Sequence, residues 1–269
     1  MRLSFCLFFS LSLIVFSCKP SFNEPQISLE DYKVEEGFEL EMVASEPLLT
    51  APVAIDFDTK GRIWVAEMAG FMVNLEGDDE DLPSGSIKIL EDLDNDGIMD
   101  HAKTFLDSLV MPRALALVYG GLLYAESPNL WFVEIEDDKP VNRVLVDSLY
   151  ATVGNPEHQP NGLMMNLDNW IYNAKSNFRY QRKDGVWKKE PTTNRGQWGI
   201  SHDNFGRLYY NNNSTQLLGD HILPNRLVRN KYFIPRKGVD ETLTKDNRVY
   251  PLHAASVNRG YEEGVLNQD

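Results

Sequence analysis

Cysteine is almost missing from this chain. The 269 residues include only two cysteines, Cys6 and Cys18, and both lie in the first 18 residues. The body that follows therefore has no disulfide, no thiolate metal site and no haem-attaching Cys-x-x-Cys-His segment. The sequence also lacks a Gly-x-Gly-x-x-Gly turn opening a helix, a Gly-x-Ser-x-Gly elbow and a His-Glu-x-x-His pair. Nucleotide-dependent, serine-hydrolase and zinc-protease chemistry are therefore without support.

Positive charge is scarce as well. Lys and Arg number 26 against 40 Asp and Glu, which gives a net charge of −14. A protein that binds nucleic acid needs a basic face, so a nucleic-acid partner is disfavoured. The hydrophobic share of 42% is ordinary for a soluble domain that buries a large core, and it favours one globular body.

Long hydrophobic runs are confined to the start of the chain. The run from Leu3 to Phe16 follows Arg2 and precedes Ser17 and Cys18. It is shorter than the roughly 20 residues of a membrane span and is typical of an export signal. Residues 15–18 resemble the lipobox of bacterial lipoproteins, although Phe16 departs from it.

We therefore expect a lipoprotein-type signal peptide over residues 1–18, with Cys18 lipidated and the protein anchored to the cell envelope. The alternative is an ordinary secretory signal in which Cys18 is incidental. Residues 19–36 are polar and without periodic pattern, which predicts a flexible tether. Residues 37–269 form the expected globular domain.

One sequence motif occurs four times after the tether. It consists of an apolar run, a tight turn with Gly, Asp or Asn, and an apolar strand rich in aromatic residues. The copies lie at residues 55–67, 115–126, 163–175 and 200–211. Each copy predicts a β-hairpin, because these turn residues tolerate the backbone angles that a hairpin requires.

The spacing of the copies predicts the fold. With Ile63, Leu122, Ile171 and Leu208 taken as equivalent, the intervals are 59, 49 and 37 residues, enough for about four strands per repeat. Radially repeated four-stranded sheets are blades, so we expect an all-β fold, a β-propeller. A β-sandwich is the alternative, although it does not explain a recurring hairpin.

The end of the chain suggests that the ring is incomplete. The last copy is followed by 58 residues, including residues 249–261, which read as a loop leading into another blade before the sequence stops without a strand. We expect the chain to contain about four blades of a larger propeller and to come from a truncated reading frame. A complete protein with an irregular end is the alternative.

An acidic segment has the spacing of a calcium loop. Carboxylates stand at loop positions 1, 3, 5 and 9, namely Asp92, Asp94, Asp96 and Asp100. Gly97 occupies position 6, but position 12 is Lys103 instead of a bidentate Glu. The pattern predicts weak binding of calcium or a similar hard cation, and the alternative is a solvated acidic turn. Zinc is disfavoured because no Cys or His set accompanies the carboxylates.

Four residues near the third and fourth hairpins are candidates for a site. His158 precedes the third hairpin, and its pKa range suits a general base, although a lone His is often only hydrogen-bonded in a loop. Arg179 follows that hairpin and could pair with a planar carboxylate. Gln197 and Trp198 precede the fourth hairpin, and residues 211–214 follow that hairpin. Equivalent positions of a propeller converge on the axis, so we expect a shared pocket; packing is the alternative.

The repeats also carry a family resemblance. Residues 37–44, 52–67 and 158–172 resemble the soluble glucose/sorbosone dehydrogenase propellers. More closely, they resemble the membrane-bound dehydrogenase propellers of environmental bacteria, which are often fused to a C-terminal haem-binding cytochrome c module. The resemblance extends over residues 37–269.

The resemblance implies a six-bladed propeller that oxidises a sugar or alcohol with pyrroloquinoline quinone (PQQ), calcium and a cytochrome c electron acceptor. It makes His158 the base, Arg179 a partner of a quinone carboxylate, and Gln197 and Trp198 part of the rim. The sequence departs from the sugar dehydrogenases where residues 159–160 separate His158 from Asn161, and where residues 211–213 lack their Glu-His pair. The rival hypothesis is a non-catalytic cell-surface propeller that binds a glycan or protein.

Overall fold

The computed structural model describes residues 28–246, apart from residues 153, 214, 227–229, 231 and 234. Sixteen strands and three 3₁₀ turns make up this part of the chain; the turns are η1 (Leu29–Asp31), η2 (Pro156–His158) and η3 (Pro224–Arg226). Within the same part, no helix is long and apolar enough to span a membrane. The expected signal peptide, Cys18 and residues 249–261 lie outside the described residues.

The strands form four antiparallel sheets of four consecutive strands each. The first comprises β1 (Pro52–Phe57), β2 (Ile63–Glu67), β3 (Gly85–Glu91) and β4 (His101–Leu109). The second comprises β5 (Pro112–Val118), β6 (Gly121–Glu126), β7 (Asn129–Glu136) and β8 (Lys139–Asp147). The third comprises β9 (Asn161–Met165), β10 (Ile171–Ala174), β11 (Phe178–Lys183) and β12 (Val186–Pro191). The fourth comprises β13 (Ser201–His202), β14 (Leu208–Tyr210), β15 (Leu218–Gly219) and β16 (Glu241–Thr242).

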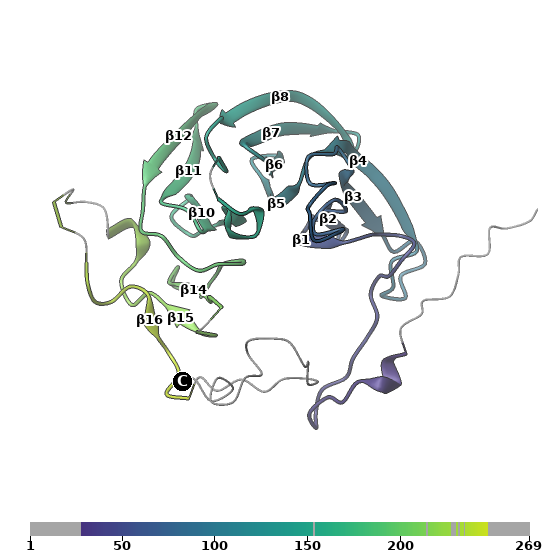
Figure 1. Cartoon of the computed structure of the whole chain (residues 1–269), viewed down its shortest axis with the longest axis horizontal. Helices are drawn as coiled ribbons and strands as arrows, with labels where there is room; N and C mark the ends of the chain where they lie inside the picture. Colours follow the sequence, from purple (N-terminus) through teal and green to yellow (C-terminus); the bar gives the residue numbers. More distant parts are fainter. Residues whose placement is uncertain are drawn as a thin grey trace, which may run out of the picture.

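The sheets are blades of a propeller. Figure 1 shows them following one another along an arc, with β1 and β5 towards the centre and β8 and β12 at the outside. Strand β5 contacts both β1 and β9, so the first strands of three blades lie next to one another. The all-β propeller prediction is confirmed, and the described blades form part of a ring.

In two of the predicted hairpins one aspartate side chain organises the turn. Asp58 closes the β1–β2 turn: its carboxylate accepts hydrogen bonds from the backbone N–H groups of Lys60 (2.8 Å) and Arg62 (3.1 Å). Asp203 repeats the arrangement in the β13–β14 turn, accepting from the N–H group of Arg207 at 3.0 Å. A carboxylate that satisfies backbone donors in this way favours a tight turn over a continuing strand.

Apolar side chains pack between neighbouring blades. Leu122 and Leu123 are adjacent in β6 and fully buried, yet they belong to different clusters. Leu122 joins Trp64 of the first blade, and Leu123 joins Ile171 of the third. Because side chains alternate between the faces of a strand, one sheet supplies both interfaces. Fully burying such side chains stabilises by about 1.5–3 kcal/mol each.

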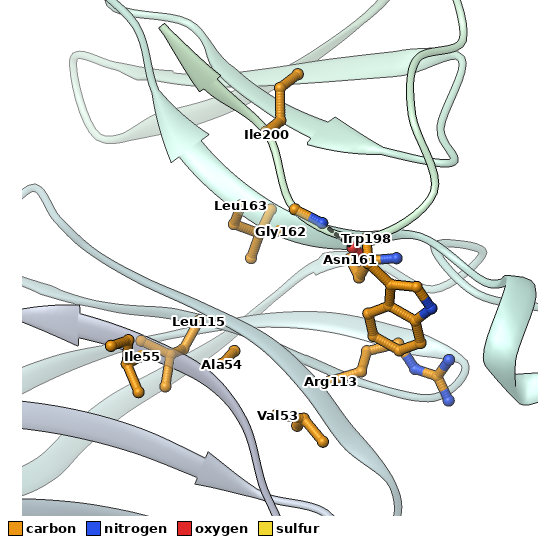
Figure 2. A pocket seen from close by; sticks show the side chains of 11 residues that line it. Val53, Ala54, Ile55, Arg113, Leu115, Asn161, Gly162, Leu163, Trp198 and Ile200 are labelled. Carbon is orange, nitrogen blue, oxygen red and sulfur yellow. Dashed lines mark hydrogen bonds between the residues drawn. The ribbon is translucent and has the colours of Figure 1, made fainter. Parts of the chain in front are cut away.

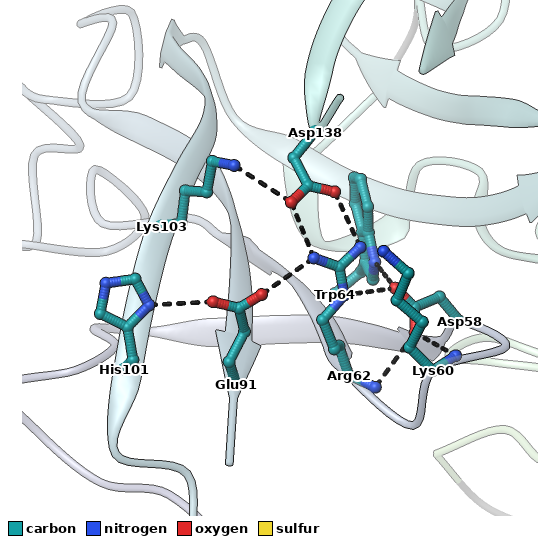
Figure 3. A network of polar contacts seen from close by, with 8 residues as sticks. All are labelled: Asp58, Lys60, Arg62, Trp64, Glu91, His101, Lys103 and Asp138. Atoms are coloured by element: carbon teal, nitrogen blue, oxygen red, sulfur yellow. Dashed lines mark hydrogen bonds and ion pairs between the residues drawn. The ribbon is translucent and has the colours of Figure 1, made fainter. Parts of the chain in front are cut away.

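A polar network also joins the first two blades. The Arg62 guanidinium donates to both carboxylate oxygens of Asp138, in the β7–β8 turn, at 2.8 Å, and to Glu91 at 2.9 Å (Figure 3). Lys103 also reaches Asp138, at 3.1 Å. These hydrogen bonds, that of Arg62 above all, hold the pKa of Asp138 well below its usual range.

The fourth blade corrects one expectation. The residues after position 211 were expected to read as a loop, but they supply β15 and β16, which complete the last sheet. Leu218 pairs with Tyr210, and Gly219 pairs with Tyr209. Each of these strands has only two residues, which is too short to show an alternating pattern in the sequence.

Candidate functional site

The inner strands of three blades share an irregularity where they begin. In β1, Val53 is an extra residue that forms a β-bulge. Its neighbours Pro52 and Ala54 pair with the consecutive residues Glu67 and Ala66 of β2. The same bulge places Arg113 as the extra residue of β5, between Pro112 and Ala114. In β9 the register shifts within residues 161–164. A bulge redirects a side chain, and bulges are frequent next to binding sites.

The bulge residues surround a cavity of about 370 Å³, which we call the axial cavity. Its walls are residues 53–55 of β1, Arg113 and Leu115 of β5, residues 161–163 of β9, and residues 198–200 before β13 (Figure 2). All these segments lie near the starts of inner strands. The cavity therefore occupies the place where a propeller gathers residues that are distant in sequence.

Asn161 fixes the wall that carries Trp198. Its side chain is buried; Oδ1 accepts a hydrogen bond from the Gly199 N–H (2.9 Å), and Nδ2 donates to the Gln197 carbonyl (2.6 Å). Gly162 has a φ of +63°, and a Cβ atom there would lie 2.6 Å from the Gly199 Cα. Only glycine permits this backbone contact. The backbone on both sides of Trp198 is thus held in place.

Arg113 is the only charged residue lining the axial cavity, within the part of the chain that the structure describes. It is 1% exposed, donates to the Pro156 carbonyl through Nη1, and leaves Nε without a partner. None of the described carboxylates forms an ion pair with it. Burial lowers the pKa of Arg113, and electrostatic interactions with Tyr150 and Glu80 oppose this shift. A buried cation without a directly bonded counter-ion is costly in a folded chain.

Three of the predicted residues lie near this cavity. Trp198 lines it, and Gln197 is buried directly beside it in the chain. His158 is exposed at the end of η2, the turn whose Pro156 carbonyl binds Arg113. The candidate base therefore stands on a turn anchored at the cavity, but it is not one of the lining residues.

Arg179 lies elsewhere. It is 6% exposed, and its guanidinium donates to the Tyr172 hydroxyl (2.9 Å) and to Glu190 (3.0 Å). It also stacks over the Trp170 ring, 4.2 Å from its centre. None of these residues lines the axial cavity. The structure therefore does not bring Arg179 together with His158 and Trp198, and its pairing with a quinone carboxylate stays a prediction.

Of residues 211–213, Asn211 lies beside Trp198. Asn211 lines a shallower hollow of about 290 Å³ together with Trp198 and Tyr209, next to the axial cavity. Ser214 is outside the described residues. The expected convergence of the loops around the fourth hairpin is thus seen for Trp198 and Asn211.

Three of the four predicted calcium ligands gather in space. Carboxylate oxygens of Asp92, Asp94 and Asp100 lie within 4.8 Å of one another. Asp96 is not part of that group, and its carboxylate accepts from the Ile98 N–H at 2.8 Å. Backbone N–H groups, that of Gly97 first, lower the pKa of Asp92. The loop can offer a few oxygens to a hard cation, as a weak site requires.

The acidic loop and the axial cavity lie at opposite ends of the strands. The loop joins β3 to β4, on the edge where Arg62 of the β1–β2 turn bonds Glu91. The cavity lies at the other edge, where β1 and β5 begin. A strand rises about 3.3 Å per residue, so the two regions are roughly 15–20 Å apart. An ion in the loop therefore cannot bind a ligand in the cavity.

Comparison with solved structures finds several sugar-related proteins at low similarity. A gluconolactonase from Xanthomonas campestris is 18% identical with a TM-score of 0.42, covering 64% of this chain and 55% of that chain. The PQQ domain of pyranose dehydrogenase from Coprinopsis cinerea is 12% identical with a TM-score of 0.43, covering 64% and 48%. A Trichoderma reesei enzyme of carbohydrate-active family AA12 is 16% identical with a TM-score of 0.44, covering 77% and 52%.

This chain spans about half the length of those proteins, and likeness at this level carries no information on substrate. No curated protein matches the sequence. A family model does match, over residues 24–268, nearly the whole chain. The chain therefore belongs to the family described as "Domain of unknown function (DUF7133)".

Proposed function

We propose that the axial cavity binds a small sugar or alcohol, and that the chain is part of a ligand-binding propeller. The observation that supports this is the half-buried Trp198 in the cavity wall, whose flanking backbone is held by Asn161 and by the contact of Gly162 with Gly199. An indole offers a flat apolar face, and such faces suit sugar rings. The cavity volume of about 370 Å³ falls in the range of small-molecule sites.

Titration of the protein with a panel of neutral sugars, sugar acids and alcohols tests this proposal, with tryptophan fluorescence as the readout. Saturable quenching is expected from the wild type and is lost in Trp198→Ala. Trp131→Phe is the matched control, because the Trp131 indole stacks under Arg143, 4.0 Å from its centre, and does not line the cavity. Absence of saturation across the whole panel, confirmed by calorimetry, contradicts the proposal.

Oxidation of the ligand is the second candidate, and it comes from the family resemblance. Bound PQQ supplies an acceptor for a hydride. The described residues fit this cofactor only in part: Arg113 matches one carboxylate, Arg179 is engaged elsewhere, and the acidic loop is at the other edge. We derive no catalytic step through the quinone for that reason.

The dehydrogenase candidate has a direct test. The full-length protein is supplied with PQQ and calcium, and dye reduction is followed with sugars and alcohols. If His158 is the base, His158→Ala reduces turnover by roughly 10²- to 10⁴-fold while PQQ affinity is retained. A cytochrome c is the proposed natural electron acceptor. A protein that binds sugar but neither binds PQQ nor reduces the dye is a non-catalytic binding propeller.

We also propose that the protein is exported and anchored by a lipid at Cys18. The support is the apolar run of residues 3–16 followed by Ser17 and Cys18. Metabolic labelling with a fatty-acid analogue is expected to mark the wild type but not Cys18→Ala. Equal labelling of the two proteins contradicts lipidation at this residue.

A further inference from the structure

We infer that the ligand of the axial cavity carries one carboxylate, which Arg113 binds, so that the site selects a sugar acid over a neutral sugar. This inference rests on the proposed function, since it names the substrate class of the same site. It starts from the position of Arg113: buried, lining the cavity, and without a carboxylate partner among the described residues.

The other deeply buried arginines show what the fold normally provides. Arg195 pairs with Asp220 at 2.6 Å, and Arg179 pairs with Glu190 at 3.0 Å. Each of these side chains also leaves one nitrogen without a hydrogen bond, so an unpartnered nitrogen alone does not distinguish Arg113. What distinguishes Arg113 is that none of the described carboxylates forms an ion pair with it. A buried charge without a directly bonded counter-ion is unfavourable, and a ligand carboxylate would supply that counter-ion.

The fold itself does not require an arginine at this place. Pro52-Val53-Ala54 and Pro112-Arg113-Ala114 have the same bulge at the same register of their hairpins. Val53 occupies in the first blade the position that Arg113 occupies in the second, and both line the cavity. A neutral side chain therefore builds the same strand, and the guanidinium is explained better by what enters the cavity than by the packing of β5.

The surroundings define the class of ligand. A guanidinium is a planar fork that matches a carboxylate, and the Nε atom of Arg113 is buried without a hydrogen-bond partner. With no second cation in the described lining, the cavity suits a monoanion better than a phosphate dianion. The remaining walls are mostly apolar, with Trp198 as a flat face (Figure 2). A hexuronate or aldonate, which joins one carboxylate to a sugar body, fits both features.

Calorimetric titration of the full chain with three ligands tests the inference: glucuronate, glucose, and benzoate as a carboxylate without a sugar. Wild type is expected to bind glucuronate at least 10-fold more tightly than glucose. Arg113→Met should weaken glucuronate binding by roughly 10- to 100-fold, as expected for loss of hydrogen bonds to a charged group, and affect glucose binding much less. Arg113→Lys should restore only part of the affinity, because an ammonium lacks the fork.

Arg143→Met is the matched control, since Arg143 is half exposed and pairs with Glu126 away from the cavity; glucuronate binding should not change. Equal wild-type affinity for glucose and glucuronate overturns the inference but leaves the proposed sugar site standing. Arg113-dependent binding of benzoate without binding of either sugar upholds carboxylate recognition and defeats the sugar proposal. The wild-type preference decides the matter even if Arg113→Met does not fold.

Discussion

Arg195 and Arg113 are equally hidden from solvent, but their surroundings differ. Arg195 is 2% exposed and donates through Nε to Asp220 (2.6 Å) and through Nη1 to Thr192 (3.0 Å). Tyr210 donates to the other oxygen of Asp220, at 2.6 Å. Arg113 has a single backbone acceptor at the edge of a cavity. Burial alone therefore does not separate a structural arginine from a ligand-binding one, whereas the presence of an internal counter-ion does.

Removing each of the two guanidinium groups should change the free energy of unfolding by very different amounts. Arg195→Met leaves Asp220 buried and unpaired, and the free energy of unfolding should fall by about 3–5 kcal/mol. Arg113→Met removes an unpaired charge and one hydrogen bond, so the change should stay within about 1 kcal/mol. Urea unfolding of both variants measures the difference. Similar losses in the two proteins would show that Arg113 is as structural as Arg195.

The cavity wall that carries Trp198 can be disturbed by one methyl group. Gly162→Ala places a Cβ atom 2.6 Å from the Gly199 Cα and should cost about 1–3 kcal/mol of stability. Ligand affinity should fall with it, because Trp198 is displaced. Gly120→Ala is the control: its φ of +74° carries the same backbone strain, but no atom lies within 4 Å of the new Cβ. If both variants lose stability equally and both keep ligand affinity, the contact with Gly199 does not position Trp198.

The partly exposed ion pair of Arg62 with Asp138 should contribute less to the free energy of unfolding. Asp138→Asn is expected to lower stability by about 0.5–1 kcal/mol at neutral pH. The pKa of Asp138 is depressed in the folded state, so its contribution is fully present above the unfolded pKa of about 4. The contribution is lost as the pH falls towards the folded pKa. Unfolding at pH 7 and pH 3 should show a smaller difference between wild type and variant at pH 3; a larger one contradicts the assignment.

The smallest effect is expected at the acidic loop. Calcium should bind with a dissociation constant of roughly 10⁻⁴ to 10⁻³ M. Asp94→Ala should weaken calcium binding further, because Asp94 belongs to the group of three carboxylates. Asp96→Ala should not weaken it, because Asp96 lies outside that group. Calorimetry with calcium alone decides the point. A wild type that gives no heat at millimolar calcium has a plain acidic turn here.

The hairpins could be predicted from sequence because the information is local. Asp58 and Gly61 specify a turn that the structure repeats at Asp203 and Gly206, in the first hairpins of the first and fourth blades. Strands β15 and β16 could not be predicted, because a two-residue strand depends on the sheet that receives it.

The site was only partly predictable. Trp198 was proposed from its place before a hairpin, and it lines the cavity. Arg179 was proposed from its place after a hairpin, but it lies in β11, and its long side chain turns towards Tyr172 and Glu190, a choice that sequence spacing does not reveal. Arg113 was missed, although a signal existed: aligning Pro112-Arg113-Ala114 with Pro52-Val53-Ala54 shows a charge where the first repeat is apolar.

Each sheet pairs only strands that follow one another in the chain. Such pairing closes short loops, and contacts between near neighbours in sequence form quickly. During synthesis at about 5–20 residues per second, a blade can therefore assemble before the next one leaves the ribosome. The second blade would then find the first already folded, with the faces of β1 and β2 ready to receive β5. The order of blades around the axis would thus also be the order in which they form.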